Sequence, residues 1–564
     1  MSLRFRVSRG RSNSYYDFIM NQDFWNTKNG TISYFPDGSL NIAYEVLDKH
    51  LNAPNRNKTA LIFEPENGDT VLYTFLDLIK LSNKIANILT NLGVVKGDRV
   101  FLFLPRIPEL YASFLGIVKT GAIAGTMFSA FGESALKDRF ENSEAKIVLT
   151  TKELSARIEQ VKNRLPKLEH ILVVDEENFK QQLEQASEQF SIVHMNSEDY
   201  AFMLYTSGTT GKPKGIVHAH GGIIQQKESA KLVLDLKDDD VYWCTADPGW
   251  VTGIVYSILA NWSLGITTIV YGGRFDAQIW YQILAKNKVS VWYTAPTAIR
   301  MLMAKGDDLV KQHDLSHVRF LASVGEPLNP EAIIWAQKVF GKPFHDTWWQ
   351  TETGSIMIAN SPTLEIKPGS MGKPLPWMNA NVFNQEGSQA QVDEEGDLVL
   401  HPPWPSIMRT VWNNQEKYDS YFKNGWYITG DRAKKDKDGY FWFVGRADDV
   451  IKTSGERVGP FEVETALIDF PGVVEAGVIG KPDSLRGEII KAFVVIKPEV
   501  KPSEELKEQL KEHVKKYLAG HAYPREIEFI DKLPKTRSGK IMRRILRAKE
   551  MGQDIGDTST LEEY

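Results

Sequence analysis

Residues 205–215 carry the densest chemical information in the sequence. They read Tyr205-Thr-Ser-Gly-Thr-Thr-Gly-Lys-Pro-Lys-Gly215 and combine hydroxyl, glycine and lysine residues. Glycines let backbone N–H groups approach an anion, hydroxyls donate to its oxygens, and lysines balance its charge. Apolar residues 202–205 predict a strand just before the segment, which favours a phosphate-binding loop over a flexible surface loop. Pro213 stands where a Walker A motif needs Ser or Thr, so a P-loop NTPase is disfavoured.

Further polar segments follow in chain order, each at a point where an apolar run ends. They are residues 246–253, 325–327, 346–354, 429–431, 445–446, 454–457 and 534–540. Asp431 follows Gly430 at the end of a strand pattern, where a carboxylate can accept hydrogen bonds from both hydroxyls of a ribose. Arg446 and Arg457 offer planar guanidinium groups suited to phosphate or pyrophosphate. An isolated aspartate at such a position is more often a turn residue, so the residues alone indicate a phosphate-binding loop and leave the role of Asp431 open.

The segments in this order resemble the motifs of adenylate-forming enzymes, the superfamily of acyl-CoA synthetases, nonribosomal adenylation domains and luciferases. The runs Ala246-Asp-Pro-Gly-Trp250 and Asp346-Thr-Trp-Trp-Gln-Thr-Glu-Thr-Gly354 are similar to those of AMP-forming acetyl-CoA synthetases, here in a shorter form. The resemblance implies a ligase that joins acetate to ATP, giving acetyl-AMP and pyrophosphate. It then transfers the acetyl group to CoA and releases AMP.

The resemblance also assigns a role to each matching position. The residues it implies for ATP and AMP are Thr206, Ser207, Gly208, Thr209, Thr210, Gly211, Lys212, Lys214, Gly325, Glu326, Pro327, Asp346, Thr347, Trp348, Trp349, Gln350, Thr351, Asp431, Arg446 and Arg457. Glu352 is the implied Mg²⁺ ligand, since carboxylate and phosphate oxygens suit that ion. Gly455 and Lys515 are the implied CoA contacts, and Asp448 is the implied hinge.

Lys540 is the implied catalytic residue, a cation that bridges the substrate carboxylate and the α-phosphate. It lies in a basic run, residues 535–549, with seven Lys or Arg residues in fifteen positions. That run alone also fits a nucleic-acid-binding tail or a solvated helix face. Ser538 and Gly539 predict a tight loop that presents Lys540, and the apolar residues after it predict an anchored helix. The resemblance further allows a protein acetyltransferase or deacetylase to act on Lys540.

Trp349 is the residue from which we predict the size of the acyl substrate. Medium-chain synthetases of the family that the sequence resembles carry glycine at this position. The resemblance therefore implies that an indole there closes the acyl tunnel. Val251, Thr252 and Val324 match the other walls of an acetate pocket. The alternative is that Trp349 is a core aromatic, which is also how we interpret Trp348 beside it. A pocket this small should accept acetate and, less well, propionate, because one methylene is worth only about 1–3 kcal/mol. A propionyl- or medium-chain acyl-CoA ligase remains the alternative.

The elements that must hold these residues follow an α/β pattern. From about Asp98, we predict strands at residues 100–104, 146–150, 171–174, 267–271, 289–293 and 319–324. We predict helices at residues 109–124, 152–165 and 276–287. This alternation indicates parallel sheets with ligands at the carboxyl ends of the strands.

After about Leu398 the pattern changes to that of an antiparallel hairpin, residues 427–429 and 440–444. A compact unit then follows, with strands at 476–479 and 492–496 and a helix from Ser503. The expected fold is a large body, residues 1–446, of parallel-sheet subdomains and a β-barrel-like subdomain. A small mobile α+β domain, residues 447–564, would carry Lys540.

Composition sets the remaining limits. The 564 residues have a formal net charge of −5, 42% hydrophobic residues and one cysteine, Cys244. A single cysteine excludes an intrachain disulfide, and we expect Cys244 to be a small buried residue. The acidic balance disfavours a nucleic-acid-binding protein. No apolar run reaches the 18 residues that span a bilayer. We therefore expect a cytoplasmic enzyme, with a basic start (residues 1–14) that superficially resembles a transit peptide.

Overall fold

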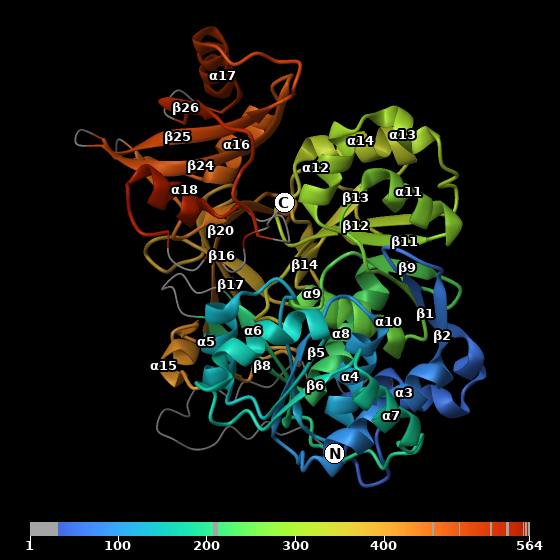
Figure 1. Ribbon diagram of the computed structural model, residues 1–564. Helices are drawn as coiled ribbons and strands as arrows, with labels where there is room; N and C mark the ends of the chain where they lie inside the picture. The colour runs from blue at the N-terminus through green and yellow to red at the C-terminus, as the bar shows by residue number, and fades with distance from the viewer. Residues whose placement is uncertain are drawn as a thin grey trace.

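The computed structural model describes residues 32–206, 213–453, 456–483, 486–518, 522–536, 541–555, 558 and 561. Within these residues no helix has both the length and the apolar character needed to cross a membrane. Figure 1 shows a large body with two main sheets and their helices, and a smaller group of C-terminal elements beside it. We call the elements up to β21 the body, and those from β22 onward the C-terminal lobe.

The first sheet of the body has nine strands, and its central strands are parallel. In sheet order the strands are β15 (Lys373–Pro374), β14 (Ile358–Ala359), β13 (Phe344–Trp348), β12 (Phe320–Val324), β11 (Val291–Thr294), β9 (Val241–Cys244), β10 (Thr267–Tyr271), β1 (Thr59–Glu64) and β2 (Val71–Thr74). The predicted strands at 267–271, 289–293 and 319–324 are confirmed. Cys244 ends β9 and is buried, as expected.

The second sheet of the body has seven strands. In order they are β18 (Thr410–Val411), β8 (Lys214–Ala219), β7 (Tyr200–Thr206), β4 (Ile123–Thr126), β3 (Arg99–Phe103), β5 (Ile147–Thr150) and β6 (His170–Val173). The strands from β7 to β6 are parallel, while β7 and β8 form an antiparallel pair that flanks residues 207–212. The strands predicted from residues 100, 146, 171 and 202 onward are confirmed.

Helices cover the faces of both sheets. In the body they are α2 (Ile42–Val46), α3 (Phe75–Asn91), α4 (Pro108–Lys119), α5 (Glu133–Ser143), α6 (Lys152–Lys162), α7 (Glu177–Gln185), α8 (Ile223–Val233), α9 (Val251–Ile254), α10 (Ala260–Ser263), α11 (Ala277–Lys286), α12 (Pro296–Ala304), α13 (Asp307–Lys311), α14 (Pro330–Phe340) and α15 (Gln415–Asp419). The predicted helix 109–124 is wrong at its end. Gly121 adopts a φ of 77°, which ends the helical path, and Ile123 already belongs to β4.

A third, antiparallel sheet joins the body to the lobe. Its strands are β16 (Ala380–Phe383), β17 (Glu395–Leu400), β19 (Phe422–Lys423), β20 (Trp426–Lys435) and β21 (Phe441–Arg446). The predicted hairpin is confirmed: β20 pairs antiparallel with β21, and Asp431 lies opposite Arg446 in the register. The buried cluster around Trp404 and Tyr427 packs under this sheet. The pairing therefore places a carboxylate and a guanidinium side by side.

The C-terminal lobe has its own sheet and its own apolar core. Its elements are β22 (Ile451–Thr453), β23 (Glu456–Val458), α16 (Pro460–Ile468), β24 (Val473–Asp483), β25 (Gly487–Ile496), α17 (Glu504–Tyr517), β26 (Glu526–Phe529) and α18 (Arg543–Glu550). Ser503 caps α17 by accepting a hydrogen bond from the Leu506 amide at 3.1 Å. The predicted α+β composition and the helix from Ser503 are confirmed.

Candidate active site

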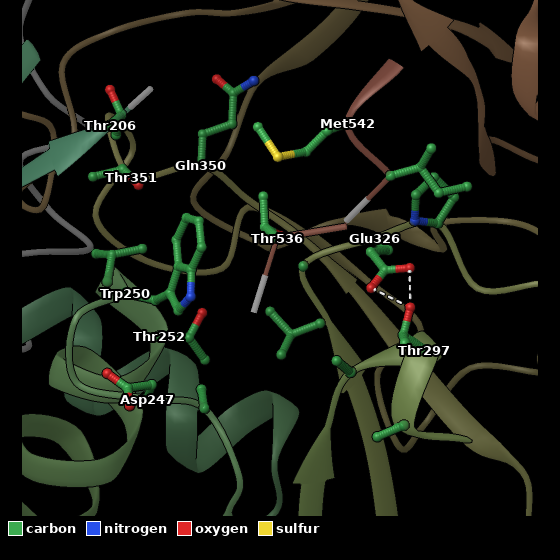
Figure 2. Close-up of a pocket in the computed structure, with 18 of the residues that line it drawn as sticks. Thr206, Asp247, Trp250, Thr252, Thr297, Glu326, Gln350, Thr351, Thr536 and Met542 are labelled. Atoms are coloured by element: carbon green, nitrogen blue, oxygen red, sulfur yellow. Dashed lines mark hydrogen bonds between the residues drawn. The ribbon is translucent and has the colours of Figure 1, made fainter. Parts of the chain in front are cut away.

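A cavity of about 1300 Å³ lies where the carboxyl ends of the parallel strands meet the C-terminal lobe. Such an edge is where open α/β sheets bind ligands. Most of the sequence-predicted site residues line it: Thr206, Lys214, Val251, Thr252, Val324, Gly325, Glu326, Pro327, Asp346, Thr347, Trp348, Trp349, Gln350, Thr351, Glu352, Asp431, Arg446 and Asp448. Figure 2 shows Thr536 and Met542 of the lobe facing the same space as Thr252 and Trp250 of the body.

Nine predicted site residues have no described side chain in this cavity. Ser207–Lys212, Gly455 and Lys540 lie outside the described residues, and for Arg457 the structure gives only the backbone of β23. Their neighbours do line the cavity, since Thr206 and Pro213 border the first segment and Thr536 and Ile541 border the last. Lys515 lies elsewhere, on α17, where it pairs with Glu512 and lies over the Tyr523 ring.

Asp431 is the centre of the most highly hydrogen-bonded wall. Its carboxylate accepts from Trp348 Nε1 at 3.0 Å, from Gln350 Nε2 at 3.0 Å and from Arg446 Nη1 at 2.8 Å. Gly430 makes room for this pair: it has a φ of 71°, and a Cβ there would lie 3.0 Å from Arg446 Nη2. Burial lowers the pKa of Arg446, but Asp431 and Asp448 outweigh it and raise the pKa, so the guanidinium stays charged.

Glu352 and Gln350 are held by two tyrosines that the sequence analysis did not single out. Tyr421 donates to Glu352 Oε1 at 2.9 Å, and Tyr427 donates to Gln350 Oε1 at 2.8 Å. Burial, followed by the charge of Glu352, raises the pKa of Tyr421, so its hydroxyl remains a donor. Tyr421 directly precedes β19 and Tyr427 lies on β20. Both residues are distant in sequence from residues 346–354, and only the fold brings them together. The local sequence around a tyrosine does not indicate which distant side chain its hydroxyl will contact.

Glu326 and Asp346 form a second polar wall at the ends of β12 and β13. The Glu326 carboxylate accepts from Thr297 Oγ1 at 2.8 and 3.0 Å, as the dashed lines in Figure 2 show, and from Arg300 Nη2 at 2.8 Å. Asp346 is buried, and its Oδ1 has no hydrogen-bond partner among the described residues. Burial raises the pKa of Asp346 well above its usual range. This wall therefore offers one fixed carboxylate and one carboxyl with an unused oxygen.

Another part of the cavity lining consists of Val251, Thr252, Val324 and Trp349. Val251, Thr252 and Val324 are 7%, 8% and 6% exposed. The Trp349 ring meets Tyr256 edge to face, with centroids 5.2 Å apart and planes at 83°. Tyr256 is fixed in turn, because its hydroxyl accepts from the Ile356 amide at 2.9 Å. An indole braced in this way gives the end of the cavity a rigid wall rather than a movable side chain.

Six arginines without an assigned role from sequence also line the cavity, and three of them follow or lie on elements of the first part of the body. These three are Arg106, after β3, Arg157, on α6, and Arg274, after β10. Arg106 donates to the Gly273 carbonyl at 2.6 Å, which brings it next to Arg274, and Arg157 donates to the Ser129 carbonyl at 2.8 Å. Their positions come from three distant segments, so no local pattern links them. Clustered guanidinium groups suit phosphate oxygens.

Comparisons with known proteins agree with this geometry. Residues 47–412 match the model of the AMP-binding enzyme family, and residues 462–540 match that of the AMP-binding enzyme C-terminal domain. A protein of Bacillus subtilis (strain 168) named acetyl-coenzyme A synthetase is 52% identical over 536 residues, with 93% of each chain covered. One of Methanothrix thermoacetophila with the same name is 42% identical over 94% of this chain and 86% of its own.

Solved structures give the same result. An anthranilate CoA ligase in complex with anthranoyl-AMP superimposes with a TM-score of 0.84 at 32% identity, covering 91% of this chain and 97% of its own. A Brucella canis acyl-CoA synthetase superimposes with a TM-score of 0.73 at 36% identity, covering 94% and 97%. The match covers the body, the lobe and the cavity between them, and the chain belongs to the family of AMP-binding enzymes.

Proposed function

We propose that the chain is an AMP-forming acetate–CoA ligase. The observation that carries the proposal is a polar wall suited to a nucleotide, around Asp431, next to an apolar end closed by Trp349. A wall closed by a braced indole favours a short acid such as acetate. The relatives named acetyl-coenzyme A synthetase are 40–52% identical to this chain, which supports the same substrate.

In the first step, an oxygen of acetate attacks the α-phosphorus of ATP, and the bond to the pyrophosphate oxygen breaks. A carboxylate is a weak nucleophile, so the step depends on positioning and on charge neutralisation rather than on a base. Asp431 would accept the ribose hydroxyls, and Arg446 would face the phosphates. Trp349 would hold the methyl group and keep longer acids out. Lys540 would bridge the acetate and the α-phosphate, a role inferred from the family motif.

Glu352 would hold Mg²⁺ together with phosphate oxygens. The residue fits, because it supplies a hard oxygen donor in the cavity and Tyr421 fixes its orientation. Among the described residues there is no group of three or more His, Cys, Asp or Glu side chains that could hold a metal. The ion would therefore be bound largely through the nucleotide, where it neutralises phosphate charge.

In the second step, the CoA thiolate attacks the acetyl carbonyl carbon, and AMP leaves as the anhydride bond breaks. We assign the phosphates of CoA to Arg106, Arg157 and Arg274. Gly455 would border the pantetheine, and Lys515 would contribute only if the lobe turned. We divide the chain into an adenylating body, residues 1–446, and a mobile domain, residues 447–564. Rotation at Asp448 would exchange Lys540 for Gly455 at the cavity.

The test is acyl-CoA formation with a panel of acids from acetate to hexanoate, together with acetate-dependent ATP–pyrophosphate exchange. We expect the highest kcat/KM with acetate, a lower value with propionate, and little product from longer acids. A maximum at four or more carbons would replace acetate by a medium-chain acid. No exchange with any acid, in the presence of MgATP, would remove adenylation altogether.

A further inference from the structure

Two sets of hydrogen bonds, joined through the adjacent residues Glu464 and Thr465 of α16, lead away from the wall at Glu326. Arg300 on α12 donates through Nη2 to Glu326 at 2.8 Å and through Nη1 to Asn329 Oδ1 at 3.1 Å. Glu326 borders the cavity two residues after β12, and Asn329 is the residue that precedes α14. One guanidinium therefore fixes both the cavity carboxylate and the amide of Asn329. We use the term relay for these contacts together with those of three residues of the lobe, Glu464, Thr465 and Arg543.

The relay crosses from the body to the C-terminal lobe at one hydrogen bond. Asn329 Nδ2 donates to Thr465 Oγ1 on α16 at 3.0 Å. The neighbouring residue, Glu464, accepts from Arg543 Nη2 at 2.6 and 2.8 Å. Arg543 is the first residue of α18 and stands three positions after Lys540. The path thus joins the wall at Glu326 to the segment that carries the implied catalytic lysine.

The relay is buried, so its groups depend on one another. The side chains of Arg300, Glu326, Glu464 and Arg543 are 10%, 8%, 5% and 15% exposed. Burial lowers the pKa of Arg300, but the carboxylates of Glu326, Glu475 and Glu464 outweigh it. Two of those carboxylates belong to the lobe, so charge complementarity also crosses the interface. Removing one partner from such a set leaves another buried and unsatisfied.

We propose that Thr465 is a positioning residue for the adenylation step. Through Asn329 and Arg300 it ties the 541–543 end of the catalytic segment to the wall that would border the nucleotide. In this pose, a bound nucleotide would steady the relay, and the relay would hold Lys540 over the α-phosphate. The proposal rests on the proposed function, because it assigns separate poses of the lobe to adenylation and to acetyl transfer.

The test uses Thr465→Val, which keeps the shape and removes the acceptor. We expect kcat of acetate-dependent ATP–pyrophosphate exchange to fall about tenfold, the effect of one unsatisfied buried hydrogen bond. Acetyl-CoA formation from supplied acetyl-AMP and CoA should keep its wild-type rate. Thr465→Ser retains the hydroxyl and should retain exchange. A merely structural role would lower both half-reactions together.

The matched control is Thr267→Val on β10. Thr267 is 7% exposed and donates to the Thr59 carbonyl at 2.7 Å, away from the cavity. It should leave the ratio of the two half-reactions unchanged. Asn329→Ala combined with Thr465→Val should lose no more exchange than the more impaired single variant, because both remove the same contact. Additive losses, equal loss of both half-reactions, or unchanged exchange in Thr465→Val would each overturn the proposal.

A readout without turnover separates this proposal from the proposed function. Amide hydrogen exchange of residues 541–550 is measured with and without MgATP. We expect MgATP to slow this exchange in the wild type and in Thr465→Ser, and to slow it less in Thr465→Val. If the wild type showed no acetate-dependent pyrophosphate exchange, the proposed function would fail. The relay would still be tested by the effect of MgATP on amide hydrogen exchange of residues 541–550. Equal protection in wild type and Thr465→Val would then refute it.

Discussion

The body and the C-terminal lobe contribute to the cavity in contrasting ways. On the body side, two polar groups make several hydrogen bonds each. Asp431 accepts from three donors, and both the nitrogen and the oxygen of the Gln350 amide are hydrogen-bonded. On the lobe side, Thr536 and Met542 reach the cavity from a segment between β26 and α18, and Thr465 bonds to Asn329 across the interface. A binding wall gains from rigidity, whereas the proposed function requires the lobe segment to leave the cavity after the first step.

The interface between the body and the lobe contains both opposite and like charges. At the relay, opposite charges alternate across it. Towards the third sheet, Glu462 of α16 faces Glu395 of β17, with Lys434 of β20 nearby. Towards α14, Glu331 lies near Asp469, and burial followed by that charge raises the pKa of Glu331. Opposite charges therefore meet at the relay, whereas like charges meet at the edges of the interface.

The strongest test of the comparison is Lys540→Ala. If the lobe supplies chemistry and the body supplies binding, acetate-dependent pyrophosphate exchange should fall about 10²–10³-fold with KM for ATP little changed. Thioester formation from supplied acetyl-AMP should persist. Lys549→Ala, an exposed lysine on α18, is the matched control and should match the wild type. Equal loss of both half-reactions would show that Lys540 does not act in adenylation alone.

Trp349→Gly tests the rigid end of the body. Removing the braced indole should shift kcat/KM about 10–100-fold from acetate towards acids of four or more carbons, since each methylene is worth about 1–3 kcal/mol. The acid panel provides the measurement. Trp349→Phe keeps a ring against Tyr256 and should keep the preference for acetate. Unchanged preference in the glycine variant would remove Trp349 from the acyl wall.

Asp431→Asn tests the polar wall. The amide keeps the shape but lacks the charge that pairs with Arg446, so KM for ATP should rise about tenfold, more than kcat falls. Steady-state exchange at varied ATP measures both. Asp397→Asn, on β17 and 3.5 Å from Arg432, changes a similar pair away from the cavity and is the control. A drop in kcat with an unchanged KM would contradict a binding role.

The smallest expected effect concerns pH. Burial and then the charge of Glu395 raise the pKa of Glu462 to about 7. A raised carboxyl pKa favours docking of the lobe at pH values below the ordinary pKa of the group. This contribution is lost as pH rises through 7. The exchange rate of the wild type should therefore fall a few-fold more between pH 6 and pH 8 than that of Glu462→Gln. Glu395→Gln should reduce the difference in part; identical profiles in all three proteins would exclude Glu462 as the group.

The sequence alone supported much of the fold, because apolar runs and their spacing are local properties. The strands at 267–271 and 319–324, the 427–444 hairpin and the helix after Ser503 were all predictable. Residues 59–91, which form β1, β2 and α3, carried no chemical motif and were not assigned. The helix predicted to Ala124 ran too far, because apolar residues resume at 122–124 after Lys119, Thr120 and Gly121 and resemble a continuation of the same helix. Only the backbone turn at Gly121 separates α4 from β4.

What the sequence determined is the set of candidate site residues, because motif residues such as Asp431, Glu352 and Lys540 sit in short contiguous runs. What the tertiary structure decided is which groups hold them. Tyr421 meets Glu352 across 69 residues, Tyr256 braces Trp349, and Asn329 reaches Thr465 across 136 residues. Such pairings depend on sheet order and on the docking of the lobe. They are set by long-range packing, which leaves no periodic signal along the chain.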